Sequence, residues 1–209
     1  MTRIQKTVFI LVALIALVVG LTVSKVLNSQ HQLDPTQLLD AGIVVLPQSR
    51  TVPSLSLTDQ DGEAVKLNEL DGQWTLLFFG YTFCPDICPT TLAELRQLNG
   101  MLPDAVRDQL RIILVSVDPN RDTPEKLKEY LGYFNAGFQG LTGPLDDIQT
   151  LANGVGIPFI PGDTSKENYT VDHSGNLVLI GPDGRQQGFI RSPLRVQKLA
   201  EQLPELVKQ

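Results

Sequence analysis

The chain has 209 residues, of which 42% are hydrophobic and 19% are charged, and only two of them are cysteines. This is an ordinary composition for a globular protein, so a hydrophobic core can form without disulfide cross-links. The formal net charge is −6, and the residues after position 25 carry 14 basic against 23 acidic side chains, a balance that argues against binding nucleic acid or an anionic membrane surface.

Residues 1–25 predict a membrane anchor. No residue from Thr7 to Ser24 is charged, and as a helix this run spans about 27 Å, close to the roughly 30 Å hydrocarbon thickness of a bilayer. Arg3 and Lys6 precede the run, so the positive-inside rule keeps the N-terminus in the cytoplasm and directs the rest outward. A cleaved signal peptide is the alternative, although no A-x-A site follows the run. Either way the remaining chain lies in an oxidising compartment.

Residues 26–50 predict a polar tether, and residues 51–209 predict one folded domain. The tether contains Pro35 and Pro47, and its short apolar patch at 43–46 can pack on an edge of the domain. Two continuous apolar runs in the domain predict strands that are buried on both faces. In chain order we expect a hairpin at 55–66, a helical turn at 67–70, a strand at 74–81, a helix at 89–99, a strand at 110–117, helices at 123–135 and 145–153, a hairpin at 176–191, and a helix at 194–207 that Pro204 interrupts or ends.

This order of elements predicts an α/β fold. The first β-α-β crossover implies parallel neighbouring strands, and the closing hairpin adds an antiparallel pair. Strands and helices follow one another as in a thioredoxin-like fold, whose central sheet has flanking helices. The additional strands before the crossover and the inserted helix are typical of its peroxiredoxin-like variant.

The two cysteines, Cys84 and Cys88, lie between the predicted strand at 74–81 and the helix that begins near Pro89. Backbone N–H groups and the helix dipole stabilise a thiolate there, which lowers the pKa of a thiol from its usual value of about 8.5. The C-x-x-x-C spacing places the two sulfurs one helical turn apart on one face. They can therefore converge on one metal ion or form a short-loop disulfide. Pro85 and Pro89 follow the cysteines directly and restrict the local backbone.

Two thiolates leave a metal site incomplete, and the candidate third ligands are the two histidines and the two methionines. Met1 is expected in the cytoplasm, Met101 lies beyond the end of the helix, and His31 lies in the tether. His173 precedes the strand expected at 176–181, and in a thioredoxin-type sheet this loop lies beside the cysteine loop. The fold therefore brings His173 to the cysteines, although a lone histidine in a loop is more often simply solvated.

Two thiolates and an imidazole form a soft, three-coordinate ligand set. Such a set suits Cu(I), and it holds Cu(II) when a weak fourth ligand or a water is added. Zinc accepts the same ligands, but a structural zinc site usually has four, and a catalytic zinc site keeps one position open. Asp172, beside His173, can orient the imidazole if its carboxylate points toward the ring.

Four stretches of the chain resemble the Sco/SenC family of copper-binding assembly proteins: FGYTFCPDICPTTL, VSVDPNRDTPEKLKEY, GLTG and YTVDHSGNLVLIGPDG. The resemblance extends in order and spacing over about residues 52–207, which is far more specific than the cysteine spacing alone. It implies a thioredoxin-like fold and copper ligation by Cys84, Cys88 and His173. The family's DPxRDT motif matches the segment that begins at Asp118. The Asp118 side chain is a candidate for a group that surrounds the metal ligands without binding the metal itself.

The resemblance implies a copper chaperone rather than an enzyme. The family delivers copper to, or reduces thiols in, the binuclear CuA centre of cytochrome c oxidase subunit II. Subunit II is therefore the expected partner, together with a periplasmic copper donor or thiol reductant. The bound metal is expected to be copper, as Cu(I) or Cu(II). The expected location is a bacterial inner membrane, with the soluble domain in the periplasm.

Two enzymatic alternatives stay open. A thiol–disulfide oxidoreductase would use Cys84 and Cys88 as its redox pair. General reductases have a C-x-x-C spacing and a cis-proline where this chain has His173, so the sequence favours reduction of one dedicated partner over general reduction. A peroxidase is the second alternative, because residues 88–90 (Cys-Pro-Thr) are similar to the peroxiredoxin nucleophile motif. Peroxiredoxins typically have an arginine near the loop that holds His173 here, whereas Arg191 lies further along the chain.

Overall fold

The computed structural model describes residues 3–29 and 34–207 and divides the chain into two units, residues 1–34 and residues 35–209. The described part of the first unit is dominated by one helix, α1 (Arg3–Ser29). Its stretch from Arg3 to Ser24 is long and apolar enough to cross a membrane, judged by length and composition. A signal sequence passes the same test, so the predicted anchor and its alternative both fit this helix.

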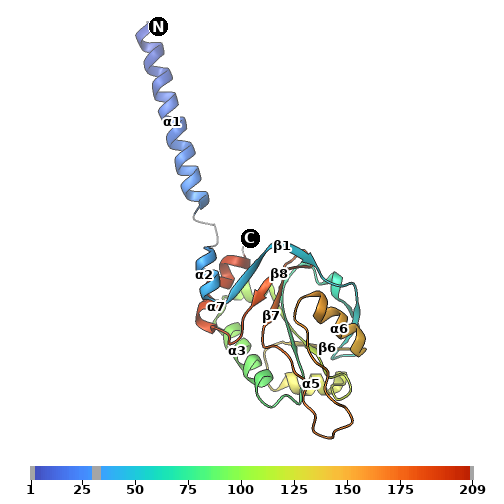
Figure 1. Ribbon diagram of the computed structural model, residues 1–209. Coiled ribbons are helices and arrows are strands. Elements are labelled where there is room, and N and C mark those ends of the chain that lie inside the picture. Colours follow the sequence, from blue (N-terminus) through green and yellow to red (C-terminus); the bar gives the residue numbers. More distant parts are fainter. Residues whose placement is uncertain (1–2, 30–33, 208–209) are drawn as a thin grey trace. The chain divides into compact units, whose positions relative to one another are not determined.

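The described residues of the second unit form eight strands and six α-helices (Figure 1). The strands are β1 (Ile43–Thr51), β2 (Ser56–Asp59), β3 (Ala64–Lys66), β4 (Trp74–Gly80), β5 (Leu110–Ser116), β6 (Gln139–Thr142), β7 (Leu177–Ile180) and β8 (Arg185–Ile190). The helices are α2 (Pro35–Asp40), α3 (Ile87–Met101), α4 (Asp104–Arg107), α5 (Pro124–Gly132), α6 (Leu145–Gly154) and α7 (Val196–Val207), and a short 3-10 turn, η1, covers Leu67–Glu69.

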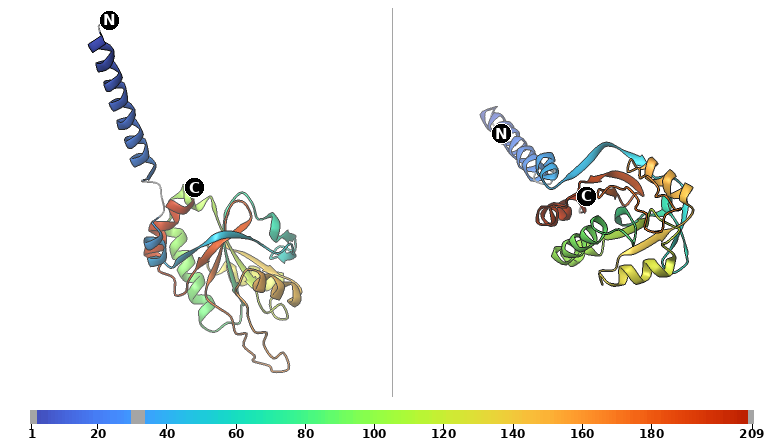
Figure 2. Two further views of the ribbon diagram at one scale, coloured as in Figure 1. Left: turned by 45° about the horizontal axis from the view of Figure 1, so that its top comes forward. Right: turned by 60° about the horizontal axis from the view of Figure 1, so that its bottom comes forward.

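All eight strands form one mixed sheet in the order β1-β8-β7-β4-β5-β6-β2-β3. β4, β5 and β6 are parallel neighbours, and the remaining pairs are antiparallel. Helices α3, α5 and α7 cover one face of the sheet and α6 covers the other (Figure 2). The placement of α3 and α5 on the same face follows from right-handed crossovers between the parallel strands β4, β5 and β6. The predicted fold class, a thioredoxin-like α/β fold, is confirmed.

The core is centred on β4, whose seven residues are all buried. Helices on both faces of the sheet explain why this strand is a continuous apolar run rather than an alternating one. β4 lies between β5 and β7, and β5 pairs with it as far as Gly80 at its carboxyl end. The chain that leaves this end carries the two cysteines.

Two local predictions are confirmed, and two predictions of where helices end are wrong. Gly62 has φ +88° in the turn between β2 and β3. Thr123 caps α5 through its side chain, which accepts a hydrogen bond from the N–H of Lys126 (3.3 Å). The helix expected to end near Asn135 ends at Gly132 instead. Pro204 was expected to interrupt or end the last helix, but the helix continues through it to Val207, because residues on both sides of the proline bury apolar side chains against the domain.

The largest difference from the sequence prediction concerns the tether expected at 26–50. Residues 30–33 lie outside the described residues, but α2 and β1 belong to the folded unit, and β1 pairs with β8 along the edge of the sheet. The pairing is irregular between Val45 and Arg50, around Pro47. An edge strand with a bulge tolerates a proline that a central strand does not. The apolar patch at 43–46 does pack on the edge, within a strand that continues to Thr51.

Candidate metal centre

The cysteines occupy the loop between β4 and α3 and the first turn of that helix. Helix α3 begins at Ile87, two residues earlier than expected, so that Cys88 lies within its first turn. The side chain of Asp86, at the N-cap position, makes no capping hydrogen bond. The sulfur of Cys84 accepts a hydrogen bond from the backbone N–H of Cys88 instead (3.4 Å). Cys84 thus satisfies one of the free N–H groups that every helix N-terminus presents.

Cys88 is fully buried against the end of β4. Its sulfur accepts a hydrogen bond from the backbone N–H of Tyr81 (3.4 Å). A Cβ atom at Gly80 would lie 2.8 Å from this sulfur, so glycine at this position allows the strand to approach it closely. Strand and helix together fix the position of Cys88 before any metal binds.

His173 comes from the segment that precedes β7, on the other side of β4 from β5. Its Nε2 lies 3.3 Å from the sulfur of Cys88. Its ring meets the ring of Tyr81 edge-on, with 5.5 Å between the centroids. Its Nδ1 lies 3.3 Å from the carbonyl oxygen of Ser174. A proton on Nδ1 donated to this carbonyl leaves the lone pair of Nε2 directed at the cysteines, which is the form that binds a metal.

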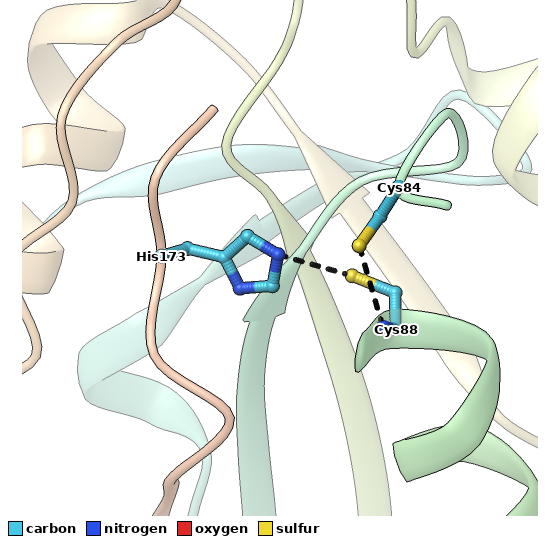
Figure 3. A group of neighbouring side chains, drawn as sticks. All are labelled: Cys84, Cys88 and His173. Atoms are coloured by element: carbon cyan, nitrogen blue, oxygen red, sulfur yellow. Dashed lines mark hydrogen bonds between the residues drawn. The ribbon is translucent and has the colours of Figure 1, made fainter. Parts of the chain in front are cut away.

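The structure brings the three predicted ligands together (Figure 3). Their ligand atoms all lie within 4.8 Å of one another. Ligand atoms about 2.0–2.3 Å from a common ion are at most roughly 4.6 Å apart, so a small inward movement suffices for all three to bind one ion. The donor set is two sulfurs and one imidazole nitrogen, two soft ligands and one borderline ligand.

The other candidates take no part in this group. Met101 is exposed at the last residue of α3. His31 and Met1 lie outside the described residues. Asp172 is exposed, and its backbone pairs with Ile160. The expectation that Asp172 can orient the imidazole through its carboxylate is therefore not supported by its position.

The two thiols share one proton unequally. A hydrogen bond from the Cys88 thiol lowers the pKa of Cys84 to about 4, and backbone N–H groups at the start of α3 contribute in the same direction while burial opposes them. The same hydrogen bond, reinforced by burial, raises the pKa of Cys88. At neutral pH the pair therefore consists of a Cys84 thiolate and a neutral Cys88 thiol.

This asymmetry predicts different reactivities for the two cysteines. In the reduced, metal-free protein at pH 6, we expect iodoacetamide to modify Cys84 much faster than Cys88, because the thiolate is the nucleophile and because Cys88 is completely buried. Mass spectrometry of peptides from timed samples measures both rates, and urea-unfolded protein is the control in which they become similar. Equal rates in the folded protein would contradict the assignment of the proton to Cys88.

Asp122, a buried aspartate in the segment after β5, holds the cysteine loop in place. Asp122 accepts hydrogen bonds from the Thr82 backbone N–H (3.0 Å), the Thr82 hydroxyl (2.6 Å) and the Ser116 hydroxyl (2.6 Å). It thereby ties the start of the cysteine loop to the end of β5, and burial raises the pKa of its carboxyl. Sequence reasoning named Asp118 and missed Asp122. The signal was available, because Asp122 lies in the same DPxRDT motif and Thr82 lies two residues before Cys84.

The family model described as SCO1/SenC matches residues 45–208 of the chain. The chain belongs to the SCO1/SenC family. This member is 48% identical over 176 residues to a protein of Stutzerimonas stutzeri named "Putative copper-binding protein", with 84% of this chain and 86% of the relative covered. The resemblance stated from the sequence is therefore confirmed.

Solved structures of other SCO1/SenC proteins are similar to this one. Copper-bound ScoI of Bradyrhizobium japonicum matches with a TM-score of 0.66 at 34% identity, covering 74% of this chain and 98% of that chain. BsSco matches with a TM-score of 0.62 at 25% identity, covering 77% of this chain and 96% of that chain. BsSco is described as having a disulfide switch and as a member of the Sco family of cytochrome c oxidase assembly proteins.

Proposed function

We propose that this SCO1/SenC protein binds copper as cargo through Cys84, Cys88 and His173 and delivers it to the CuA centre of cytochrome c oxidase subunit II. The observation that carries the proposal is the convergence of two sulfurs and one imidazole nitrogen within 4.8 Å of one another. Relatives of similar fold are copper-bound, which supports copper as the metal. In this proposal α1 anchors the protein in a bacterial inner membrane and the domain faces the periplasm.

The ligand set favours copper over zinc. Thiolates and an imidazole in a three-coordinate site suit Cu(I), whereas a structural zinc site usually has four ligands. Within residues 3–29 and 34–207, this group of three is the one cluster of at least three His, Cys, Asp or Glu side chains with metal-binding spacing. Because Cys84 already carries a thiolate, binding as a bis-thiolate requires the loss of one proton, from Cys88.

The exposure of the ligands fits a role in transfer. Cys88 is fully buried, Cys84 is 9% exposed, and His173 is partly buried. A three-coordinate ion leaves room for an incoming ligand, so a thiolate of the partner can bind before the last ligand of this chain dissociates. Copper then passes from one protein to the other without being released into solvent.

A second candidate function is dedicated reduction of a disulfide in subunit II. The observation that favours it is the pairing of a Cys84 thiolate, with a pKa of about 4, and a buried Cys88 thiol one helical turn away. The thiolate of Cys84 attacks one sulfur of the partner's disulfide and releases the other as a thiolate. Cys88 then loses its proton and attacks Cys84, which forms the Cys84–Cys88 disulfide and frees the second partner thiol. Two electrons pass to the partner, and a periplasmic thiol reductant restores the pair.

Peroxide reduction is less well supported. Cys88, the residue that matches the peroxiredoxin motif, is fully buried and has a raised pKa, which is the opposite of what an attacking thiolate needs. Arg191 is exposed, and its backbone N–H bonds to Gly42 at the edge of the sheet. Rapid peroxide turnover with a thiol donor would nevertheless establish this activity.

Transfer to purified subunit II tests the proposal. Full-length protein in detergent is loaded with Cu(I) under reducing conditions and mixed with metal-free, reduced subunit II, and copper on each protein is measured after separation. We expect about one copper per chain at the start, and its appearance on subunit II afterwards. In a parallel reaction, metal-free reduced protein is mixed with disulfide-bonded subunit II. Loss of that disulfide without copper transfer in the first reaction would favour the second candidate.

A further inference from the structure

His173 is carried by an irregular segment rather than by a helix or a strand. Between the end of α6 and the start of β7, residues 155–176 contain one isolated bridge, in which Ile160 and Asp172 exchange backbone hydrogen bonds (2.9 and 3.3 Å). Backbone pairing alone therefore fixes little of this segment. The position of His173 in the metal-free protein depends on side chains that tie the segment to the sheet.

Tyr169, four residues before His173, makes three contacts of this kind. Its carbonyl oxygen accepts a hydrogen bond from Nη2 of Arg121 (3.1 Å). Its ring lies against the same guanidinium, with 3.7 Å between Cζ and the ring centroid. Its hydroxyl donates to Oδ1 of Asp118 (2.6 Å). The backbone, ring and hydroxyl of Tyr169 are thus all held by Arg121 and Asp118, two residues of the DPxRDT segment.

Arg121 also contacts the cysteine loop. Its guanidinium lies 4.8 Å from the ring centroid of Phe83 and 5.7 Å from that of Tyr81. Phe83 directly precedes Cys84 in the sequence. Arg121 is itself fixed by an ion pair between its Nε and Asp118, whose side chain is 2% exposed. One guanidinium therefore lies between the loop that carries the cysteines and the segment that carries the histidine.

Two further contacts connect the same parts of the chain. The backbone N–H of Val171, two residues before His173, donates to the Tyr81 hydroxyl (3.3 Å). Gly162 packs against Tyr169 so closely that a Cβ at position 162 would overlap the tyrosine ring. The outgoing and returning arms of the segment are thereby held together at Tyr169.

We propose that Arg121 and Tyr169 are positioning residues for metal binding, which hold His173 beside Cys84 and Cys88 before copper arrives. This inference rests on the proposed function, because it takes His173 as a copper ligand. When a ligand is in place for only a fraction of the time, the apparent dissociation constant rises in inverse proportion to that fraction. We therefore expect loss of the contact between loop and segment to weaken copper binding through His173.

The first test measures Cu(I) affinity by competition with a chelator, using the full-length protein in detergent. We expect Arg121→Ala to weaken binding by about 10-fold or more, within the range found for outer partners of metal ligands. Arg121→Lys keeps the charge but loses the planar guanidinium that donates the hydrogen bonds and stacks on the aromatic rings. It is therefore expected to weaken copper binding nearly as much as Arg121→Ala does. Full affinity in Arg121→Lys would mean that the charge, not the positioning, matters, and would overturn the proposal.

Arg185→Ala is the matched control. Arg185 makes three hydrogen bonds, to the Ser49 hydroxyl (2.8 Å), the Ser49 carbonyl (2.9 Å) and the Thr51 hydroxyl (3.2 Å). These bonds join β1 to β8, at an edge of the sheet, and involve neither the cysteine loop nor the His173 segment. We expect unchanged copper affinity in this variant, and a loss as large as that of Arg121→Ala would assign the effect to general destabilisation.

A double-mutant cycle separates positioning from other roles. In the His173→Ala background, Arg121→Ala should cause no further loss of copper affinity, because its effect acts through the missing imidazole; additive losses would overturn the proposal. Tyr169→Leu leaves the ion pair between Arg121 and Asp118 intact, and it should likewise cause no further loss of copper affinity in the His173→Ala background. It replaces Arg121→Ala in the experiment if that variant does not fold. Unchanged affinity in His173→Ala would instead overturn the ligand set itself, so failure of the proposed function is recognised separately.

Discussion

Replacing His173 by alanine is expected to weaken Cu(I) binding by at least about 100-fold, because loss of a ligand costs more than the roughly 10–100-fold lost with an outer partner. The remaining thiolates can still hold Cu(I), with a lower affinity. Cys84→Ser and Cys88→Ser remove a thiolate each and are expected to leave no measurable binding at copper concentrations that fill the unaltered protein. Competition with a Cu(I) chelator measures all three variants.

Asp172→Ala is the matched control for His173→Ala. It lies in the same segment, its side chain is exposed, and its only described tertiary contact is the backbone bridge to Ile160, which alanine retains. We expect native copper affinity in this variant. If His173→Ala also retained full affinity, the three-ligand site would be wrong.

Gly188→Ala is expected to destabilise the domain by about 3 kcal/mol, at the upper end of the cost of overpacking. Gly188 lies in β8 opposite Val45 of β1. A Cβ atom at this position would overlap the carbonyl oxygen of Val44, and a backbone atom cannot move aside as a side chain can. Pairing between β1 and β8 must therefore be lost locally, which urea unfolding followed by circular dichroism measures.

Gly100→Ala provides the comparison for this variant. Gly100 lies in α3, and a Cβ there would have no neighbour within 4 Å. Alanine in a helix is favoured over glycine by roughly 0.5–1 kcal/mol, so this variant is expected to be slightly more stable than the unaltered protein. Equal stability of Gly188→Ala and Gly100→Ala would mean that β1 does not pair with β8, and the segment at 26–50 would then be a tether as the sequence indicated.

The core of the fold was predictable because its signals are local. The apolar runs at 74–81 and 110–117 identify strands that are buried on both faces, and Thr123 with the proline that follows it marks the start of α5. The position of His173 was predictable for a different reason. Once the order of elements indicated a thioredoxin-like sheet, the topology brought the loop before β7 to the cysteine loop without any local signal at His173 itself.

The parts that sequence reasoning missed depend on tertiary contacts. β1 contains Pro47 and polar residues, so that only its pairing with β8 identifies it as a strand. β6 has four residues, and one of them, Gly140, lies so close to α5 that a Cβ there would be 2.9 Å from a side-chain atom of Leu131. The contact of Arg121 with Tyr169 joins residues 48 positions apart in segments without regular periodicity. No sequence pattern predicts such a contact.

X-ray absorption spectroscopy of the Cu(I)-loaded, full-length protein tests the proposed copper site directly. We expect a three-coordinate copper with two sulfur ligands and one nitrogen ligand, and His173→Ala should lose the nitrogen and keep both sulfurs. A native spectrum with three or four sulfurs, or with no nitrogen, would contradict a site formed by Cys84, Cys88 and His173 in one chain.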